Sequence, residues 1–338
     1  MQNGTISENT ATKWGGGVYN TGTLILSDGE ISNNTANDSG AGIKNYGLLT
    51  MNGGTITKNN STTEIGGGGG VENNGTFTMQ GGTISENSAY RGGGIRCNAG
   101  IVTMNAGIIS KNTALKKGAG VMINGGARFE MFGGKIAENI AVNNGGGGGV
   151  YVEGIFLMEN GEISNNEAYK GGGICNNSEK SFFTMKDGII TKNKRDGIYN
   201  LGELSIIGGK IFENERYGVY NKYKSSGESG KVEMTGGVIR NNRMCGVQNS
   251  DTISIFLIGG DAYIPFDENE NNYVVLSTPI SICGNLTYET VAFIYSSGAH
   301  VLTTAEGADS SLLEENYRKF KLLNTNYTIN NLGYVVAQ

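Results

Sequence analysis

The sequence predicts an all-β fold, a right-handed parallel β-helix in which about ten coils of chain stack into a solenoid with a C-terminal cap. Three observations predict it. An Ile-x-x-Asn motif occurs ten times at intervals of about 26 residues, which is a solenoid period. Apolar and polar residues alternate within each repeat, as in TIS and FTM, and a period of two is typical of β-strands. Glycine clusters separate the short strands, as corners require.

The first element of each repeat is an expected strand that carries an inward isoleucine and ends at an asparagine three residues later. Stacking of coils places equivalent residues above one another, so each asparagine amide can bond the next. Asparagine tolerates the left-handed backbone conformation, and we expect it to turn the chain here. The predicted asparagine ladder consists of Asn9, Asn34, Asn59, Asn87, Asn112, Asn139, Asn166, Asn193, Asn214 and Asn242.

Two more strands are expected in each repeat. One opens with valine or isoleucine directly after a glycine, and the other carries an apolar pair spaced by two, such as Phe77 with Met79 or Phe156 with Met158. A period of two points both members of the pair to the same side of the strand. We expect about four inward apolar side chains per coil, each contributing roughly 1.5–3 kcal/mol on burial.

The repeat divides the chain into an array at 1–250 and irregular terminal coils with a cap at 251–338. Residues 309–323 place Leu312, Leu313, Asn316, Tyr317 and Phe320 at helical spacing, after a possible cap in the Asp-Ser pair at 309–310. A final strand is expected near NLGYVVAQ. Since the last coil of a solenoid leaves backbone groups and apolar edges uncovered, we expect 251–338 to cover them.

Composition and charge exclude several classes of partner. The formal net charge of −5 gives the molecule no general attraction for nucleic acid or anionic membranes. No apolar run approaches the roughly 20 residues of a membrane span. We therefore expect no nucleic-acid partner and no membrane insertion by this segment. The sequence begins inside a repeat, so any export signal is expected upstream of it.

The sequence predicts no enzyme activity, no cofactor and no metal site. Catalysis or Ca²⁺ binding on a solenoid face needs carboxylates at matching positions of adjacent coils, and the aspartates do not fall that way. The single histidine, His300, has no evident Ser or Cys partner. The run DENENN at 267–272 lacks the spacing and glycine of a calcium loop.

Cysteine spacing limits the possible disulfides. Cys97, Cys175 and Cys245 fall on the fourth, seventh and tenth repeats, so neighbours are roughly 14 Å apart at the usual strand spacing. A disulfide requires Cα atoms within about 7 Å, which excludes pairing among these three. Pairing of Cys245 with Cys283 remains open.

The late coils are predicted to carry a ligand face. Their corners shorten to one glycine, which should expose the outward residue after valine or isoleucine. Residues 186–243 hold eleven Lys and Arg against seven Asp and Glu. Tyrosines beside cations can stack sugars and attract acidic groups, although ordinary surface tyrosines with solvated cations give the same pattern. The candidate ligand-binding residues are Tyr151, Tyr199, Tyr220, Lys194, Arg195, Arg216, Lys222 and Lys224.

The GGGV/GGGI and I-x-x-N signatures resemble the GGA[ILV] and FxxN repeats of chlamydial polymorphic outer-membrane proteins. More generally, they resemble adhesin-like right-handed β-helix proteins of bacterial surfaces. Isoleucine replaces the phenylalanine of that family, and glycine replaces its alanine. The stretch NYVVLSTPISICGNLTYETVAFIY is similar to the closing module of such proteins. The resemblance implies an extracellular, cell-surface location and, as partner, a host or neighbouring-cell surface glycan or protein.

Two function classes follow from these expectations. The first is a non-catalytic cell-surface segment, adhesin-like or stalk-like, that presents an elongated binding face. The second is a glycan-binding or polysaccharide-active β-helix module with its site on one face.

Overall fold

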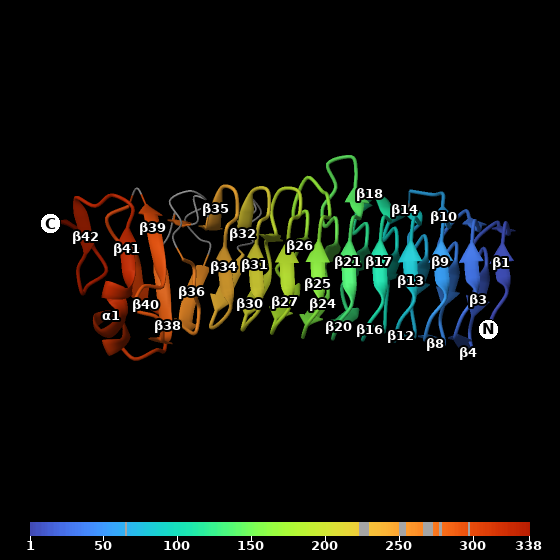
Figure 1. The fold of residues 1–338 in the computed structure, drawn as a ribbon, viewed down its shortest axis with the longest axis horizontal. Coiled ribbons are helices and arrows are strands. Elements are labelled where there is room, and N and C mark those ends of the chain that lie inside the picture. Colours follow the sequence, from blue (N-terminus) through green and yellow to red (C-terminus); the bar gives the residue numbers. More distant parts are fainter. Residues whose placement is uncertain (65, 223–229, 250–254, 266–272, 277–278, 297) are drawn as a thin grey trace.

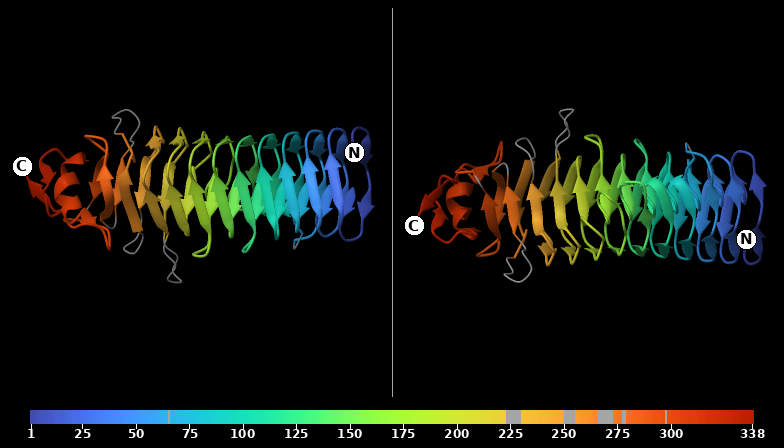
Figure 2. Two further views of the ribbon diagram at one scale, coloured as in Figure 1. Left: turned by 90° about the horizontal axis from the view of Figure 1, so that it is seen from below. Right: turned by 90° about the horizontal axis from the view of Figure 1, so that it is seen from above.

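The chain is a rod of stacked coils. The computed structural model describes residues 1–338 except 65, 223–229, 250–254, 266–272, 277–278 and 297. Parallel strands stack as a β-solenoid of about 11 turns, which confirms the predicted fold class. The two termini lie at opposite ends of the rod, and the short helix α1 lies at the C-terminal end (Figures 1 and 2).

The first six coils pass through four sheets, which we number 1 to 4 in chain order, and the later coils contain no strand of sheet 2. Sheet 1 carries the isoleucine of the repeat, and sheet 2 follows the ladder asparagine. Sheet 1 contains β1 (Thr5–Ser7), β5 (Glu30–Ser32), β9 (Thr55–Thr57), β13 (Thr83–Ser85), β17 (Ile108–Ser110), β21 (Lys135–Ala137), β25 (Glu162–Ser164), β28 (Ile189–Thr191), β31 (Lys210–Phe212) and β34 (Val238–Arg240). Sheet 2 contains β2 (Thr10–Ala11), β6 (Thr35–Ala36), β10 (Asn60–Ser61), β14 (Ser88–Arg91), β18 (Thr113–Lys117) and β22 (Ile140–Ala141).

Sheets 3 and 4 run further toward the C-terminus than sheets 1 and 2. Sheet 3 contains β3 (Val18–Asn20), β7 (Ile43–Asn45), β11 (Val71–Asn73), β15 (Ile95–Cys97), β19 (Val121–Ile123), β23 (Val150–Val152), β26 (Ile174–Asn176), β29 (Ile198–Asn200), β32 (Tyr217–Asn221), β35 (Cys245–Asn249), β37 (Val274–Leu276), β39 (Ala292–Ser296) and β41 (Phe320–Leu322). Sheet 4 contains β4 (Thr23–Leu26), β8 (Leu48–Met51), β12 (Thr76–Met79), β16 (Ile101–Met104), β20 (Arg128–Met131), β24 (Ile155–Met158), β27 (Phe182–Met185), β30 (Glu203–Ile206), β33 (Lys231–Met234), β36 (Ile255–Gly260), β38 (Ile280–Leu286) and β40 (Leu302–Thr304).

Sheets 1, 3 and 4 enclose the main core, and each inward position stacks on its equivalent. Ile84 pairs in register with Ile56 and Ile109, and Met79 pairs with Met104. The isoleucine row and the methionine row are buried along the rod. Phe156 stacks on Phe183 with ring centroids 4.8 Å apart. Like side chains therefore fill the same layer in successive coils, as the apolar spacing predicts.

The asparagine ladder runs without a break through the ten coils. Each Nδ2 donates to the Oδ1 of the next asparagine, at 2.9–3.1 Å, from Asn9 to Asn242. Each turn does contain a left-handed residue, but this residue precedes the asparagine. Positive φ angles of 53–60° occur at Glu8, Asn33, Lys58, Glu86, Lys111, Glu138, Asn165, Lys192, Glu213 and Asn241. The expectation that asparagine itself takes this conformation is wrong, because its amide must point along the ladder.

A second asparagine ladder lines sheet 3, where the sequence analysis did not identify one. Asn20, Asn45 and Asn73 bond successively at 2.7 Å, and a later run bonds in the same way. The later run consists of Asn176, Asn200, Asn221 and Asn249. Between the two runs, the apolar side chains of Cys97, Ile123 and Val152 fill the same row. The sequence does contain a signal for this second ladder, because an asparagine lies two residues after the valine or isoleucine that opens the strand, as in V-Y-N and I-K-N.

Sheet 2 was not expected, because the sequence analysis counted three strands per coil. In the first seven coils the chain between the ladder asparagine and sheet 3 bulges outward as a lobe. A separate buried cluster of Ala114, Ala119, Ala141 and Ala168 packs inside this lobe. The chain approaches itself so closely here that a Cβ on Gly148 would lie 2.6 Å from both backbone N and O of Glu167. We call this narrow contact the small-residue seam.

The C-terminal segment continues the solenoid before it closes. Sheets 3 and 4 extend past residue 250 with no change of direction. Within 309–323 the helix is shorter than its spacing suggests: α1 spans Ser311–Asn316, a 3₁₀ turn spans Tyr317–Lys319, and Phe320 already belongs to sheet 3. The Asp309 carboxylate accepts a bond from the Ser311 amide. The expected final strand is β43 (Val335–Ala337), which pairs antiparallel with β42 (Tyr327–Ile329).

Candidate ligand groove

The lobe ends after the seventh coil, and its end leaves a step on the surface of the rod. Four residues separate Asn193 from Ile198 at the start of the next sheet 3 strand, whereas eight separate Asn112 from Val121. Sheet 2 ends at β22, and only isolated bridges through Glu167 and Lys194 continue its line. The eighth to tenth coils begin with β28, β31 and β34 and contain no strand of sheet 2.

Both rows of the small-residue seam change identity at this step. In the first seven coils, the residue two places after the ladder asparagine is small: Ala11, Ala36, Ser61, Ala89, Ala114, Ala141 and Ala168. The next three coils place Arg195, Arg216 and Met244 there. The facing row of glycine and alanine, two residues before the inward valine or isoleucine of sheet 3, becomes Asp196, Tyr217 and Cys245. Large and charged side chains therefore replace rows that elsewhere hold only glycine, alanine and serine.

These substitutions line a surface hollow that we call the arginine groove. It has a volume of about 590 Å³ and is lined by Tyr169, Arg195, Glu215, Arg216, Arg243 and Met244. A second hollow of about 350 Å³ shares Tyr169, Arg195 and Glu215 with it and extends back along the end of the lobe to Ala141. The two hollows share these three lining residues, and their linings come from the sixth to the tenth coils along the rod axis.

The cations of the groove differ in how they are held. Lys194 pairs with Glu167 at 2.6 Å, and this contact raises the pKa of the lysine. The Arg195 guanidinium lies 4.3 Å from the Tyr169 ring centroid and donates to the Tyr169 carbonyl. Such stacking leaves the edge of a guanidinium open to a ligand. Arg243 is exposed and makes no ion pair with any residue that the structure describes.

Arg216 differs from its neighbours because a buried carboxylate lies beneath it. Asp196 is fully buried, and the distance from its Oδ1 to Nη1 of Arg216 is 3.8 Å, which is too long for a hydrogen bond. Burial raises the pKa of Asp196 to about 6, and the Arg216 charge offsets only part of that effect. The guanidinium also lies 4.5 Å from the Tyr217 ring centroid and 5.3 Å from that of Tyr220.

The expectation that Tyr151 and Tyr199 form an exposed face is wrong. Their exposed fractions are 4% and 7%, and they pack in a cluster with Met122, Cys175 and Leu201. The lobe folds back over the outer face of sheet 3, so that the Lys117 ammonium lies 4.7 Å from the ring centroid of Tyr151. Burial raises the pKa of this tyrosine. The length of the corners in the sequence does not reveal that the lobe covers these tyrosines.

The remaining predicted residues lie near the groove. Tyr220 is half-buried, contacts Tyr199 edge-on at 5.5 Å, and accepts a bond from Lys222 at 3.4 Å. Lys194, Arg195 and Arg216 line the depression or its floor. Lys224 lies outside the described residues. Tyr169, Arg243 and Met244 were not predicted from the sequence, although the loss of the alanine row is visible there and marks this region.

The same outward row of sheet 3 holds buried charges near the N-terminus. Lys44 and Glu72 form an ion pair at 2.9 Å with side chains almost fully buried, and Arg96 lies 3.9 Å from the same Glu72 oxygen. Lobe backbone covers this triad, since a Cβ on Gly40 or Gly68 would touch the backbone and Cβ of Lys44 or Glu72. The early coils therefore use this row for internal packing.

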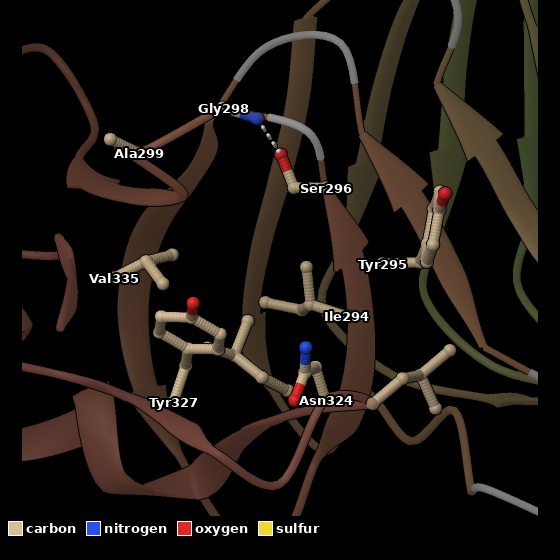
Figure 3. A pocket seen from close by; sticks show the side chains of 10 residues that line it. Ile294, Tyr295, Ser296, Gly298, Ala299, Asn324, Tyr327 and Val335 are labelled. Atoms are coloured by element: carbon tan, nitrogen blue, oxygen red, sulfur yellow. Dashed lines mark hydrogen bonds between the residues drawn. The ribbon is translucent and has the colours of Figure 1, made fainter. Parts of the chain in front are cut away.

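The cap contains a separate hollow of about 350 Å³ (Figure 3). Ile294 and Val335 point toward it, with Tyr327 and Asn324 at its side. Its lining is mainly apolar and comes from β39, β41 and the terminal hairpin. His300 lies outside this lining and stacks on Tyr334, with ring centroids 4.4 Å apart.

Among the described residues, no three His, Cys, Asp or Glu side chains are grouped so that they could hold a metal ion. The DENENN segment lies outside the described residues. No disulfide joins Cys97, Cys175, Cys245 and Cys283, so the open possibility of a Cys245–Cys283 bond is not realised. In the described parts of the chain, no helix has the length and apolar character needed to cross a membrane.

Comparisons with known protein families, curated proteins and solved structures found nothing that matches this chain.

Proposed function

We propose that this chain is a rigid, non-catalytic cell-surface segment, adhesin-like or stalk-like, that holds a binding site at a fixed place on a rod. The observation that carries this proposal is the asparagine ladder, whose side-chain hydrogen bonds join ten consecutive coils. Each coil is tied to the next by the same inward residues, so outward residues can vary without loss of stacking. That division suits a scaffold that displays a binding surface.

The location and partner of the rod follow from the sequence resemblance. Adhesin-like β-helices imply an extracellular position on the cell surface and a glycan or protein of a host or neighbouring cell as partner. The segment 186–243, with its excess of Lys and Arg, supports an acidic partner. The alternative, a glycan-binding or polysaccharide-active module, is supported at one place, the arginine groove, where cations and aromatic rings meet in a depression.

Bead adhesion tests the proposal. Beads coated with the full chain should be retained under flow on epithelial or bacterial cells, well above beads coated with an inert protein. Incubation of the soluble chain with a panel of polysaccharides should release no reducing ends. Retention no better than that of inert beads would contradict the adhesive role, and release of reducing ends would replace it with the polysaccharide-active alternative.

A further inference from the structure

We infer that the arginine groove binds an acidic polysaccharide, whose sugar units carry both carboxylates and hydroxyl groups, along the axis of the rod. This inference rests on the proposed function, because it names the ligand and the site that the rod displays. Four steps support it, from the location, the spacing, the mixture of polar groups and the apolar contacts of the groove.

The location of the groove follows from a systematic change in the repeat, and not from scattered differences among surface residues. Two rows that are small in seven successive coils become large and charged in the next three, at the place where the covering lobe ends. The side chains of Arg195 and Arg216 are too large for the narrow seam of the earlier coils, so the two facing segments must be further apart where these arginines occur. The same sequence change therefore removes the cover and supplies the cations.

The spacing of the cations suits a chain ligand. Arg195 and Arg216 hold equivalent positions on adjacent coils, so their backbones are separated by about 4.8 Å, the parallel strand spacing. Arg243 lies on the following coil, one residue earlier in the repeat. Guanidinium groups bind carboxylates through paired hydrogen bonds. One coil is about as long as one sugar ring, so a glycan along the axis meets a new guanidinium at each step.

The mixture of donors and acceptors favours an acidic glycan that bears hydroxyl groups over a polyanion that lacks them. Glu215 lies between the arginines and Glu167 lies beside Lys194. A polyanion without hydroxyl groups, such as a polyglutamate peptide, cannot offset the repulsion by these carboxylates. The carboxylates can accept hydrogen bonds from the hydroxyl groups of a sugar.

Apolar surface at the groove completes the match. Tyr169 and Met244 are both about half-exposed on its wall, at 48% and 47%. The apolar faces of sugar rings pack on such side chains, while the sugar hydroxyls remain free for the polar groups around them.

The test uses the full chain and oligosaccharides of galacturonic acid eight units long. Binding is measured by calorimetry at low salt and at 150 mM salt, because the higher salt concentration screens the attraction between exposed charges. Arg195→Gln/Arg243→Gln is the test variant, because both side chains are exposed and neither pairs with a buried carboxylate. Lys58→Gln/Lys111→Gln is the matched control, since it removes the same charge from exposed sites on distant coils.

We expect the wild-type chain to bind the oligouronate and the test variant to bind at least tenfold more weakly, with the control variant within twofold of wild type. The fully methyl-esterified oligosaccharide should bind at least tenfold more weakly than the acid. Equal loss in both variants, equal affinity for the ester, tighter binding of a heparin oligosaccharide or a polyglutamate peptide, or no oligouronate binding would each overturn the inference. Bead adhesion of the wild-type chain, measured in parallel, separates the two proposals: adhesion without oligouronate binding refutes this ligand and leaves the display role standing.

Discussion

At the scale of single residues, the ladder asparagines combine turn and stacking functions that no other side chain can supply. The Nδ2 of Asn112 donates to Ile84 O and to Asn139 Oδ1, and its own Oδ1 accepts from the amide and Nδ2 of Asn87. Four hydrogen bonds therefore meet at one fully buried side chain. A residue without an amide leaves several buried partners unsatisfied.

We predict that Asn112→Leu lowers the free energy of unfolding by about 3–5 kcal/mol, since several buried donors and acceptors lose their partners together. Chemical denaturation monitored by circular dichroism measures the change. The control is Asn52→Leu, at an exposed asparagine whose side chain bonds no described residue. A shift of the Asn112 variant no larger than that of the control would show that the ladder does not stabilise the rod.

Asp196 makes the stability of the rod depend on pH. Its folded pKa of about 6 is higher than the roughly 3.9 of an unfolded chain. Above pH 6 the carboxylate is ionised in both states, and burial penalises the folded one. Below pH 4 it is protonated in both states and the penalty disappears, so this group contributes more stability as the pH falls from 6 to 4.

We therefore predict that Asp196→Asn raises the free energy of unfolding by about 1–3 kcal/mol above pH 6.5, and that this gain disappears as the pH falls to 4. The Arg216 side chain remains one-third exposed, so loss of its partner leaves no fully buried charge. Thermal melts of both proteins between pH 4 and 8 give the difference. A destabilised variant at pH 7, or a difference that is constant with pH, would contradict the assignment.

At the scale of elements, the small-residue seam determines where the lobe can exist. The lobe packs backbone against backbone, so its facing rows hold only glycine, alanine and one serine. The outer face of sheet 3 then becomes a second buried layer, which explains why Tyr151 and Tyr199 belong to the packing of the rod. The two tyrosines are thus structural, and their substitution is a poor test of ligand binding.

We predict that Gly148→Ala destabilises the protein by about 1–3 kcal/mol or more, because the added methyl group would lie 2.6 Å from the backbone of Glu167 and from the Gly172 carbonyl. Its φ lies outside the left-handed range, so the effect reports packing alone. Gly22→Ala is the control, since nothing lies within 4 Å of the new methyl group. Equal midpoints of denaturation for the two variants would show that the seam has room to relax.

At the scale of the whole molecule, the C-terminal segment closes the open end of the solenoid. Phe320 pairs with Ala292, and Leu302 pairs with Ile280, so the last coils supply strands to both sheets 3 and 4. Leu312 of α1 joins the main core from the end. Removal of these parts uncovers strand edges and apolar side chains together.

We predict that deletion of residues 301–338 produces soluble aggregates, detected by size-exclusion chromatography with light scattering, because the apolar end of the core becomes exposed. Deletion of 325–338 alone removes only the terminal hairpin and should leave a monomer of lower stability. A monomeric 1–300 chain with unchanged melting temperature would show that the last segment is an independent appendage.

The sequence by itself determined the interior of this protein. A solenoid requires each inward row to match itself, so Ile84, Met79 and Asn87 repeat at the solenoid period and can be read directly as stacked layers. The ladder, the apolar rows and the position of the closing segment all follow from that repetition. The shorter helix does not, because Phe320 gains more by pairing in sheet 3 than by extending α1.

The tertiary structure alone decided the outer surface. Whether Tyr199 is exposed, or whether Arg216 lies over a buried carboxylate, depends on the path of the variable chain between the ladder and sheet 3. That path does not repeat in length, so no period in the sequence reports it. The side chain in the left-handed turn, such as Lys58, was likewise decided by the direction in which the neighbouring asparagine must point. The sequence repeat specifies which inward residues stack on one another. Which outward residues are buried depends instead on contacts with the segments between the ladder and sheet 3, whose lengths differ from coil to coil.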